Sequence, residues 1–218
     1  MKEEEIYRDT KNWYLKTKKN QAYSKFINLT THYAGNKILD VGCATGDYCI
    51  KLKQLGFECI GVDINHDYIE KARKNGIEAY KMDAEDLRFD EESFDTVLLF
   101  EVLEHVKNPD RVLNEAKRVA RKNILITLPN CTEFSSLKKF NLTYEHMLEQ
   151  DHLNFFTKKD LEELLSQKFR NFTVEEIEPI NNIIGLPNWL NYFLNGLIRL
   201  KLIKSDKIYS KLISIVEV

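Results

Sequence analysis

The residues best suited to chemistry in this sequence surround a glycine-containing turn. Residues 38–47 read Ile-Leu-Asp-Val-Gly-Cys-Ala-Thr-Gly-Asp, an apolar run that leads into two glycines and a helix start. Glycine lets the backbone approach a ligand closely, and in doubly wound sheets the ligand lies beyond the carboxyl ends of the strands. Asp63 follows Gly42 by 21 positions, which is about where a carboxylate that binds ribose hydroxyls belongs. This spacing predicts a ligand that contains adenosine.

The charges around this turn distinguish between adenosine cofactors. A dinucleotide fingerprint needs a second glycine to admit the pyrophosphate, and Ala44 occupies that position. Asp40 and Asp47 flank the turn, where they would repel a pyrophosphate and attract a cation. S-adenosylmethionine carries a sulfonium and an ammonium group and no phosphate, so it fits better than NAD. After the next predicted strand, Asp83 can accept a hydrogen bond from the adenine amino group, and Ala84 offers backbone to the ring.

A glycine turn alone also occurs as a tight turn without any ligand. Here the acids at three strand ends, Asp40, Asp63 and Asp83, favour a ligand. A carboxylate in apolar surroundings costs several kcal/mol unless it has a partner, so three of them imply a polar ligand nearby.

A second cluster of chemically active residues follows at Glu101, Glu104 and His105. These residues stand at i, i+3 and i+4, so a helical turn would project all three side chains from one face. Two carboxylates and an imidazole are suitable ligands for Mg²⁺ or Mn²⁺, and His152 would supply a fourth. In the metal-free alternative, which we favour, His105 or His152 is a general base that takes the proton of an attacking hydroxyl. For His152, a structural hydrogen bond in a loop beside two phenylalanines is an equal alternative.

An alternation of apolar and amphipathic runs predicts the elements that position these residues. Almost continuously apolar runs predict strands at residues 37–41, 57–62, 79–82, 95–100, 124–128, 172–177 and 212–218. Helix starts and stops are marked by Asp47, Asn65, Asn75-Gly76, Asn108-Pro109 and the capping pair Thr157 and Asp160. A further helix is predicted at residues 11–27. The pattern predicts an α/β fold, a doubly wound, Rossmann-like, seven-stranded and mostly parallel sheet with helices on both faces.

The length and composition predict one domain over residues 1–218. Its expected parts are an N-terminal helical cap at 1–36, a Rossmann-like core at 37–178, and a lid or insertion with the last strand at 179–218. Lys and Arg number 32 against 34 Asp and Glu, so the basic excess of a nucleic-acid binder is missing. The four cysteines form no C-x-x-C pair, and no apolar run follows the acidic first residues. Reduced thiols in a cytoplasm are therefore expected.

One stretch near the C-terminus has an unusual composition. Residues 179–198 carry no charge, but five are Asn and four are Pro or Gly, which does not suit a membrane span. Basic residues follow at Arg199, Lys201, Lys204, Lys207 and Lys211. We expect a surface-lying or lid segment that takes part in core packing or a dimer contact, in a monomer or homodimer. Contact with a membrane surface through residues 186–211 is the alternative.

The sequence resembles the class I S-adenosylmethionine-dependent methyltransferases, in the branch that methylates small molecules and quinone precursors. The resemblance covers roughly residues 37–156 and rests on Leu39–Gly46, Gly61–Asp63, Asp83-Ala84, Phe94–Val97, Glu101–Val106, Leu128–Asn130 and His152–Thr157. It implies that Gly42, Cys43 and Gly46 pack the methionine end of the cofactor and that Asp63 holds both ribose hydroxyls. It also implies that Asp83 contacts adenine, and it places Phe100 and Glu101 beside the sulfonium. The remaining expected cofactor residues are Asp40, Ile64 and Ala84.

The resemblance also defines the expected reaction. It implies methyl transfer to an oxygen, in preference to carbon or nitrogen, of a small or lipid-linked acceptor. The family includes RNA 2′-O-methyltransferases and quinone O-methyltransferases that place a metal on a similar quartet, so a metal-assisted RNA 2′-O-methyltransferase is one alternative. A protein that binds S-adenosylmethionine as a sensor, without transferring its methyl group, is the other.

Overall fold

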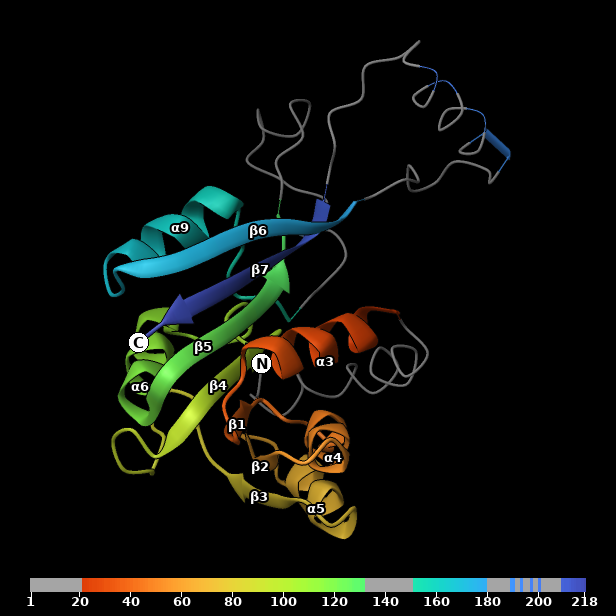
Figure 1. The fold of residues 1–218 in the computed structure, drawn as a ribbon. Helices are drawn as coiled ribbons and strands as arrows, with labels where there is room; N and C mark the ends of the chain where they lie inside the picture. The colour runs from red at the N-terminus through yellow and green to blue at the C-terminus, as the bar shows by residue number, and fades with distance from the viewer. Residues whose placement is uncertain are drawn as a thin grey trace.

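Seven strands form one sheet in the computed structural model, which describes residues 21–131, 151–179 and 209–218 together with positions 189, 190, 193, 197 and 200. The strands are β1 (Lys37–Val41), β2 (Glu58–Asp63), β3 (Glu78–Lys81), β4 (Phe94–Phe100), β5 (Ala120–Pro129), β6 (Asn171–Pro179) and β7 (Tyr209–Glu217). Their order is β3-β2-β1-β4-β5-β7-β6 (Figure 1). Only β7 runs antiparallel to its neighbours, β5 and β6. The predicted seven-stranded, mostly parallel sheet is confirmed.

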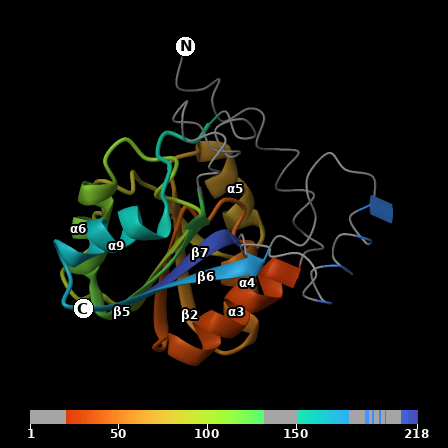
Figure 2. The ribbon, with the colours of Figure 1, turned by 90° about the horizontal axis from the view of Figure 1, so that it is seen from above.

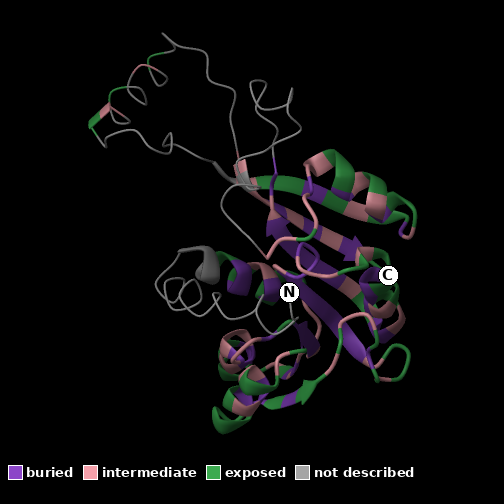
Figure 3. Ribbon diagram, turned by 180° about the vertical axis from the view of Figure 1, so that it is seen from behind, coloured by how far each residue is buried: buried purple, intermediate pink, exposed green. Residues whose placement is uncertain are grey.

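Helices cover both faces of this sheet, as predicted (Figure 2). They are α3 (Gln21–Tyr33), α4 (Asp47–Gln54), α5 (His66–Lys74), α6 (Pro109–Val119) and α9 (Lys158–Ser166). Apolar side chains of α3, α4 and α5 pack with Ile38 and Leu98. Those of α6 and α9 pack with Leu39 and Val97. Because successive strand residues point to opposite faces, β1 and β4 contribute to both cores, and Figure 3 shows these central strands buried.

The helix starts follow the predicted caps. The side chain of Asn65 accepts hydrogen bonds from the backbone N–H groups of Asp67 and Tyr68 at the start of α5. Asn108 caps α6 in the same way, with Pro109 at the first helical position. Thr157 and Asp160 form the predicted capping box of α9. Polar residues with little helix propensity of their own thus fix where the chain enters each helix.

Several boundaries differ from the prediction, and β5 begins at Ala120 rather than residue 124. The predicted helix 11–27 ended too early, since α3 continues to Tyr33, while residues 11–20 lie outside the described part. Burial of Phe26, Ile27 and Thr30 stabilises this continuation, and the Thr30 hydroxyl donates to the Phe26 carbonyl at 2.8 Å. The last strand begins at Tyr209 rather than residue 212, because its first residues pair with β5 and β6. None of the described helices is long and apolar enough to cross a membrane.

Candidate active site

The turn after β1 is held by backbone hydrogen bonds to β2. The N–H groups of Gly42 and Cys43 both donate to the Val62 carbonyl, at 2.8 and 2.9 Å. Gly42 has φ +74°, and a Cβ there would lie 2.9 Å from Cγ2 of Val102. Gly46 has φ +81° at the N-cap of α4. Both predicted glycines therefore adopt backbone conformations that side chains disfavour, in a turn at the carboxyl end of β1.

Asp63, the last residue of β2, faces this turn. One carboxylate oxygen accepts a hydrogen bond from the Ala44 N–H at 2.9 Å, and the other accepts from the Asn65 N–H at 2.8 Å. Burial raises the pKa of Asp63, and the two N–H donors oppose that rise. Each oxygen keeps a second lone pair, so the carboxylate can still accept two hydroxyl donors. Asp63 thus fits the predicted contact with a ribose.

The residues expected to contact adenine lie beside Asp63 at the same edge of the sheet. Ile64 follows Asp63 directly and is 47% exposed, which leaves an apolar surface for a flat ring. Asp83 is exposed, and its carboxylate accepts from the Glu85 N–H at 2.9 Å. Ala84 is half-buried next to it. An apolar side chain and an open carboxylate suit the face and the amino group of adenine.

Asp40 has a different position from the other predicted acids. Its side chain is 2% exposed, and the Cys49 thiol donates to it at 3.6 Å. Burial raises the pKa of Asp40 to about 7, the Cys49 contact lowers it, and the charge of Asp63 raises it. Asp40 therefore lies beneath the turn, where it affects the charge of the site from inside the protein.

The thiol of Cys43 fills the space above Gly61 of β2. A Cβ at Gly61 would lie 2.6 Å from Sγ of Cys43, so only glycine fits there without displacement. Burial raises the pKa of the Cys43 thiol, which packs as a small apolar side chain. No disulfide joins the four cysteines of the chain.

Phe100 ends β4 and Glu101 follows it, next to the turn. The ring of Phe100 is buried between α3 and α4, with its centroid 5.5 Å from those of Phe26 and Tyr48. Glu101 has φ +57° and accepts a hydrogen bond from the Thr127 hydroxyl at 3.0 Å. The ammonium group of Lys211 forms an ion pair with the same carboxylate.

Neither Lys211 nor Thr127 was predicted as a site residue. Lys211 lies 110 positions from Glu101 in the sequence, and Thr127 lies 26 positions away. Only the pairing of β5 with β4 and β7 brings them to Glu101. Thr127 is the one polar residue within the apolar run 124–128, at a fully buried position, and this interruption is the sequence signal that singles it out.

Glu104, His105 and His152 come together after β4. One ligand atom from each of these residues lies within 4.8 Å of the others, and the two imidazole centroids are 4.9 Å apart. A helical turn does not form after β4: residues 103–105 form a single hydrogen-bonded turn, in which the His105 N–H donates to the Val102 carbonyl at 3.0 Å. Glu101 consequently does not join this group, although it was expected on the same face. Three of the four predicted metal ligands are thus adjacent.

A second segment holds His152 against these turns. The backbone N–H groups of Leu153 and Asn154 donate to the Glu104 carbonyl at 2.7 and 3.0 Å. The Asn154 side chain donates to the carbonyls of Leu103 and Val106 at 3.0 and 2.7 Å. These four hydrogen bonds fix the segment that carries His152 to the one that carries Glu104 and His105.

Burial shifts the pKa values of two members of this group toward their uncharged forms. Glu104 is 2% exposed, and neither carboxylate oxygen has a hydrogen-bond partner among the described residues. Burial, followed by the charge of Glu101, raises the pKa of Glu104 well above its ordinary value. Burial also lowers the pKa of His152 to about 4, and the neighbouring His105 adds to this effect. Near neutral pH His152 is therefore a neutral imidazole, and burial favours the protonated form of the Glu104 carboxyl.

Comparisons with known proteins show similarity in sequence and in fold. A model of the methyltransferase domain family matches residues 15–177. An uncharacterized protein of Methanocaldococcus jannaschii, MJ1123, is 30% identical over 170 residues, which cover 73% of this chain and 80% of that protein. A crystal structure of a SAM-dependent methyltransferase from Archaeoglobus fulgidus has a TM-score of 0.69 at 21% identity, covering 94% of this chain and 99% of that one. The last comparison shows a shared fold.

Two relatives with named activities match less than half of the chain. A phosphatidylethanolamine N-methyltransferase of Cereibacter sphaeroides is 34% identical over 104 residues, or 44% of this chain and 51% of that protein. A ubiquinone biosynthesis O-methyltransferase of Methylococcus capsulatus is 32% identical over 109 residues, or 47% of this chain and 46% of that protein. The chain thus spans about half the length of these two relatives. Because the family model matches most of the sequence, the protein belongs to the methyltransferase domain family and is a methyltransferase.

Proposed function

We propose that the protein transfers a methyl group to a hydroxyl oxygen of a small or lipid-linked acceptor. The observation that carries this proposal is the close approach of the Glu104 carboxyl and the His105 and His152 imidazoles, after β4, where Val102 lies against Gly42 of the turn after β1. A hydroxyl must lose its proton during methylation, and this group contains a base and a neutral hydrogen-bonding partner. The ubiquinone O-methyltransferase relative supports oxygen as the acceptor atom. We also propose that the protein belongs to the branch of the family that methylates small molecules and quinone precursors.

We assign cofactor binding to the turn after β1 and the ends of β2, β3 and β4. Asp63 would hold the ribose hydroxyls, Ile64 and Asp83 the adenine, and Gly42 would admit the methionine end. When bound, S-adenosylmethionine supplies an electrophilic methyl group next to a positive sulfur. Glu101 would face this positive charge, and Lys211 would hold its carboxylate in place.

We assign the role of general base to His105. Its Nδ1 lies 3.2 Å from the carbonyl oxygen of Asp151, and it lies 3.6 Å from a carboxylate oxygen of the same residue. An Nδ1–H that donates to Asp151 leaves Nε2 as the atom that takes the hydroxyl proton. His152, neutral and beside it, would orient the acceptor, and the carboxyl of Glu104 would donate a hydrogen bond.

Two variants test the base. His105→Gln should lower kcat by about 100-fold or more while leaving S-adenosylmethionine affinity unchanged. His66→Gln, on the exposed first turn of α5, is the matched control and should keep full activity. Equal kcat values for His105→Gln and the wild type would exclude His105 as the base.

A matched acceptor pair tests the atom that is methylated. Radiolabelled S-adenosylmethionine should label a phenol faster than the aniline of the same carbon skeleton. Faster labelling of the aniline would point to nitrogen, as in the phosphatidylethanolamine N-methyltransferase relative. Cofactor binding without label in any lipid or small-molecule fraction of a cell extract would support the sensor alternative.

The group also supports a second candidate, metal-assisted transfer. Glu104, His105 and His152 supply a carboxylate and two imidazoles, which is a suitable donor set for Mg²⁺ or Mn²⁺. A bound metal would lower the pKa of an acceptor hydroxyl. The fit is incomplete, since Lys211 already neutralises Glu101. Calorimetric binding of Mn²⁺ that is lost in His152→Gln, together with loss of activity on chelation, would favour this candidate, including its RNA 2′-O-methyltransferase form.

A further inference from the structure

Three large apolar side chains between β6 and β7 are far more exposed than any other in the described part of the protein. Trp189 is 70% exposed, Phe193 is 58% exposed and Leu200 is 69% exposed, whereas no other large apolar side chain described exceeds 49%. Trp189, Leu190, Phe193 and Leu197 have helical backbone. Positions 189, 193, 197 and 200 follow the spacing of one helix face. We refer to the four residues at these positions as the Trp189 stripe.

Basic residues follow this stripe in the sequence. Residues 199–211 contain Arg199, Lys201, Lys204, Lys207 and Lys211 against one acidic residue, Asp206. The whole chain has a net charge of −2, so this local excess of positive charge stands apart from the rest. Exposed aromatic and aliphatic side chains next to lysines and arginines are the combination that binds the interface of an anionic bilayer.

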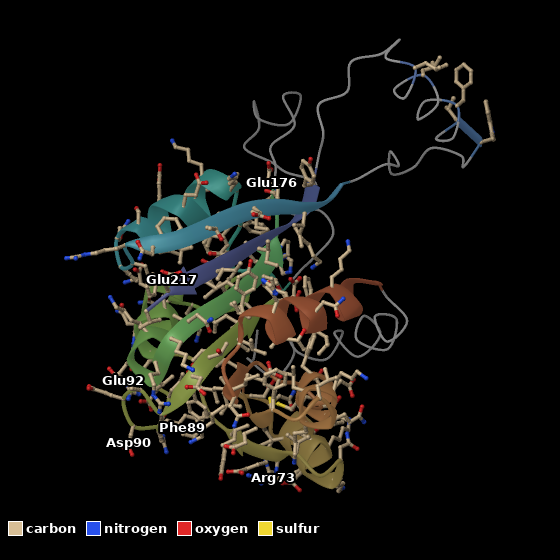
Figure 4. The ribbon with its side chains drawn as sticks, viewed as in Figure 1. Arg73, Phe89, Asp90, Glu92, Glu176 and Glu217 are labelled. Atoms are coloured by element: carbon tan, nitrogen blue, oxygen red, sulfur yellow. The ribbon has the colours of Figure 1, made fainter. Side chains whose placement is uncertain are left out.

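The stripe is attached to the sheet at the edge that carries the candidate active site. The last residue of β6, Pro179, pairs in the sheet with the first residue of β7, Tyr209. Asn130, at the end of β5, donates to the Glu176 carboxylate at 2.9 Å and to the Tyr209 carbonyl at 3.1 Å. Figure 4 labels Glu176 on β6 near this end of the sheet, and the described helical residues lie beyond it. Lys211, two residues after Tyr209, contacts Glu101 of the site.

We propose that the Trp189 stripe docks on the surface of an anionic phospholipid bilayer. Its apolar side chains enter the interface, and Arg199, Lys201, Lys204 and Lys207 lie among the anionic headgroups. Docking turns the active-site edge of the sheet toward the membrane, where a lipid-linked acceptor is found. This last step rests on the proposed function, whereas the docking itself does not.

Other occupants explain fewer of the observations. Packing within this chain would cover the stripe, whereas its most exposed members are more than half accessible. A dimer would bury the apolar side chains, but it would not use the excess of positive charge that follows them. A spanning helix is not found among the described residues. An anionic bilayer surface can bind both the apolar stripe, through its hydrocarbon interface, and the basic residues, through its headgroups.

Flotation with lipid vesicles tests the docking in the full chain without cofactor or acceptor. The protein should float with vesicles of phosphatidylcholine and phosphatidylglycerol and remain unbound with phosphatidylcholine alone. Trp189→Ser with Phe193→Ser should lower the partition coefficient by about tenfold or more. Lys201→Gln with Lys204→Gln should lower it by about tenfold at low salt, and high salt should have the same effect on the wild type. Leu55→Ser, an exposed apolar residue after α4, is the control and should bind as the wild type does.

Three results would overturn the docking proposal. They are no binding to the anionic vesicles, unchanged binding of the Trp189 and Phe193 double variant, and a wild-type dimer that this variant dissociates in analytical ultracentrifugation. Calorimetric S-adenosylmethionine binding, expected to be equal in both proteins, shows that the variant is folded. Vesicle binding without methylation of any acceptor would contradict the proposed function alone, because flotation requires no reaction.

Discussion

The ammonium group of Lys211, near the start of β7, is paired with the carboxylate of Glu101 at the end of β4. The same carboxylate accepts a hydrogen bond from Thr127 of β5, so three strands meet at one side chain. Glu101 also has a left-handed backbone, with φ +57°. Side-chain contacts of this kind hold a residue in a conformation that it would otherwise disfavour.

Lys211→Met should lower the free energy of unfolding by about 2 kcal/mol. The substitution leaves the Glu101 carboxylate, whose side chain is only 16% exposed, without its cation. Lys158→Met, which removes an exposed ion pair with Glu162, should change the free energy by less than about 0.5 kcal/mol. Urea unfolding measures both, and equal stability of the two variants would show that the Lys211 pair contributes little.

Asp63→Asn should weaken S-adenosylmethionine binding by about 10- to 100-fold, because a charged acceptor of hydrogen bonds is lost. In the wild type, the Ala44 and Asn65 N–H groups each donate to a different carboxylate oxygen of Asp63. The amide of asparagine has only one oxygen, so it can accept only one of these two hydrogen bonds in the same geometry. Asp67→Asn, in the exposed first turn of α5, is the matched control. Isothermal titration calorimetry decides the point, and unchanged affinity in Asp63→Asn would remove Asp63 from the cofactor site.

Gly61→Ala should lower the free energy of unfolding by about 2 kcal/mol, because the new methyl group overlaps the Cys43 thiol. Cys43→Ala in the same chain should recover part of this loss. The recovery is incomplete because the new Cβ would also lie 2.9 Å from Cβ of Cys43. A double-mutant cycle by thermal or urea unfolding measures the coupling. Additive effects of the two substitutions would contradict the close contact.

Asp40→Asn should change how stability depends on pH. The pKa of Asp40 is raised from 3.8 to about 7 in the folded protein, so the folded state holds this proton more tightly than the unfolded state does. The contribution of the protonated Asp40 carboxyl to the free energy of unfolding is therefore full below about pH 4. It is lost as the pH rises toward 7, and the loss amounts to roughly 4 kcal/mol. Relative to wild type, Asp40→Asn should become more stable across this range.

Urea unfolding of both proteins at several pH values gives the difference directly. The difference is the useful quantity, because His152, with its lowered pKa, contributes in the opposite direction between about pH 4 and 6.5. A constant difference between Asp40→Asn and the wild type from about pH 4 to 7 would show that Asp40 titrates as an exposed carboxyl does.

The sequence predicted the elements whose causes are local. The caps at Asn65, Asn108 and Thr157 and the glycine turn depend on residues within a few positions of one another. The continuation of α3 to Tyr33 was not predicted, because packing on the sheet outweighs the weak helix propensity of its last residues.

The same distinction applies to the candidate site. The proximity of Asp63 to Gly42 could be predicted from their positions at strand ends, since parallel strands bring their carboxyl ends to one edge of the sheet. The separation of Glu101 from Glu104 and His105 depends on turns that residue spacing could not distinguish from a helix. The contact with Lys211 depends on the pairing of β7 with β5, across more than half of the chain.

The attachment of His152 also bears on how new specificities can arise. The Cys131 N–H donates to the Phe156 carbonyl at 2.9 Å, and Leu153 and Asn154 are bonded to the Glu104 carbonyl. The chain between positions 131 and 151 is therefore bracketed by bonds that belong to the site itself. These bonds join His152 to Glu104 and His105 through residues on either side of that interval. Under the proposed function, we expect a chimera that exchanges the interval to keep the group of Glu104, His105 and His152 together, whichever acceptor it takes.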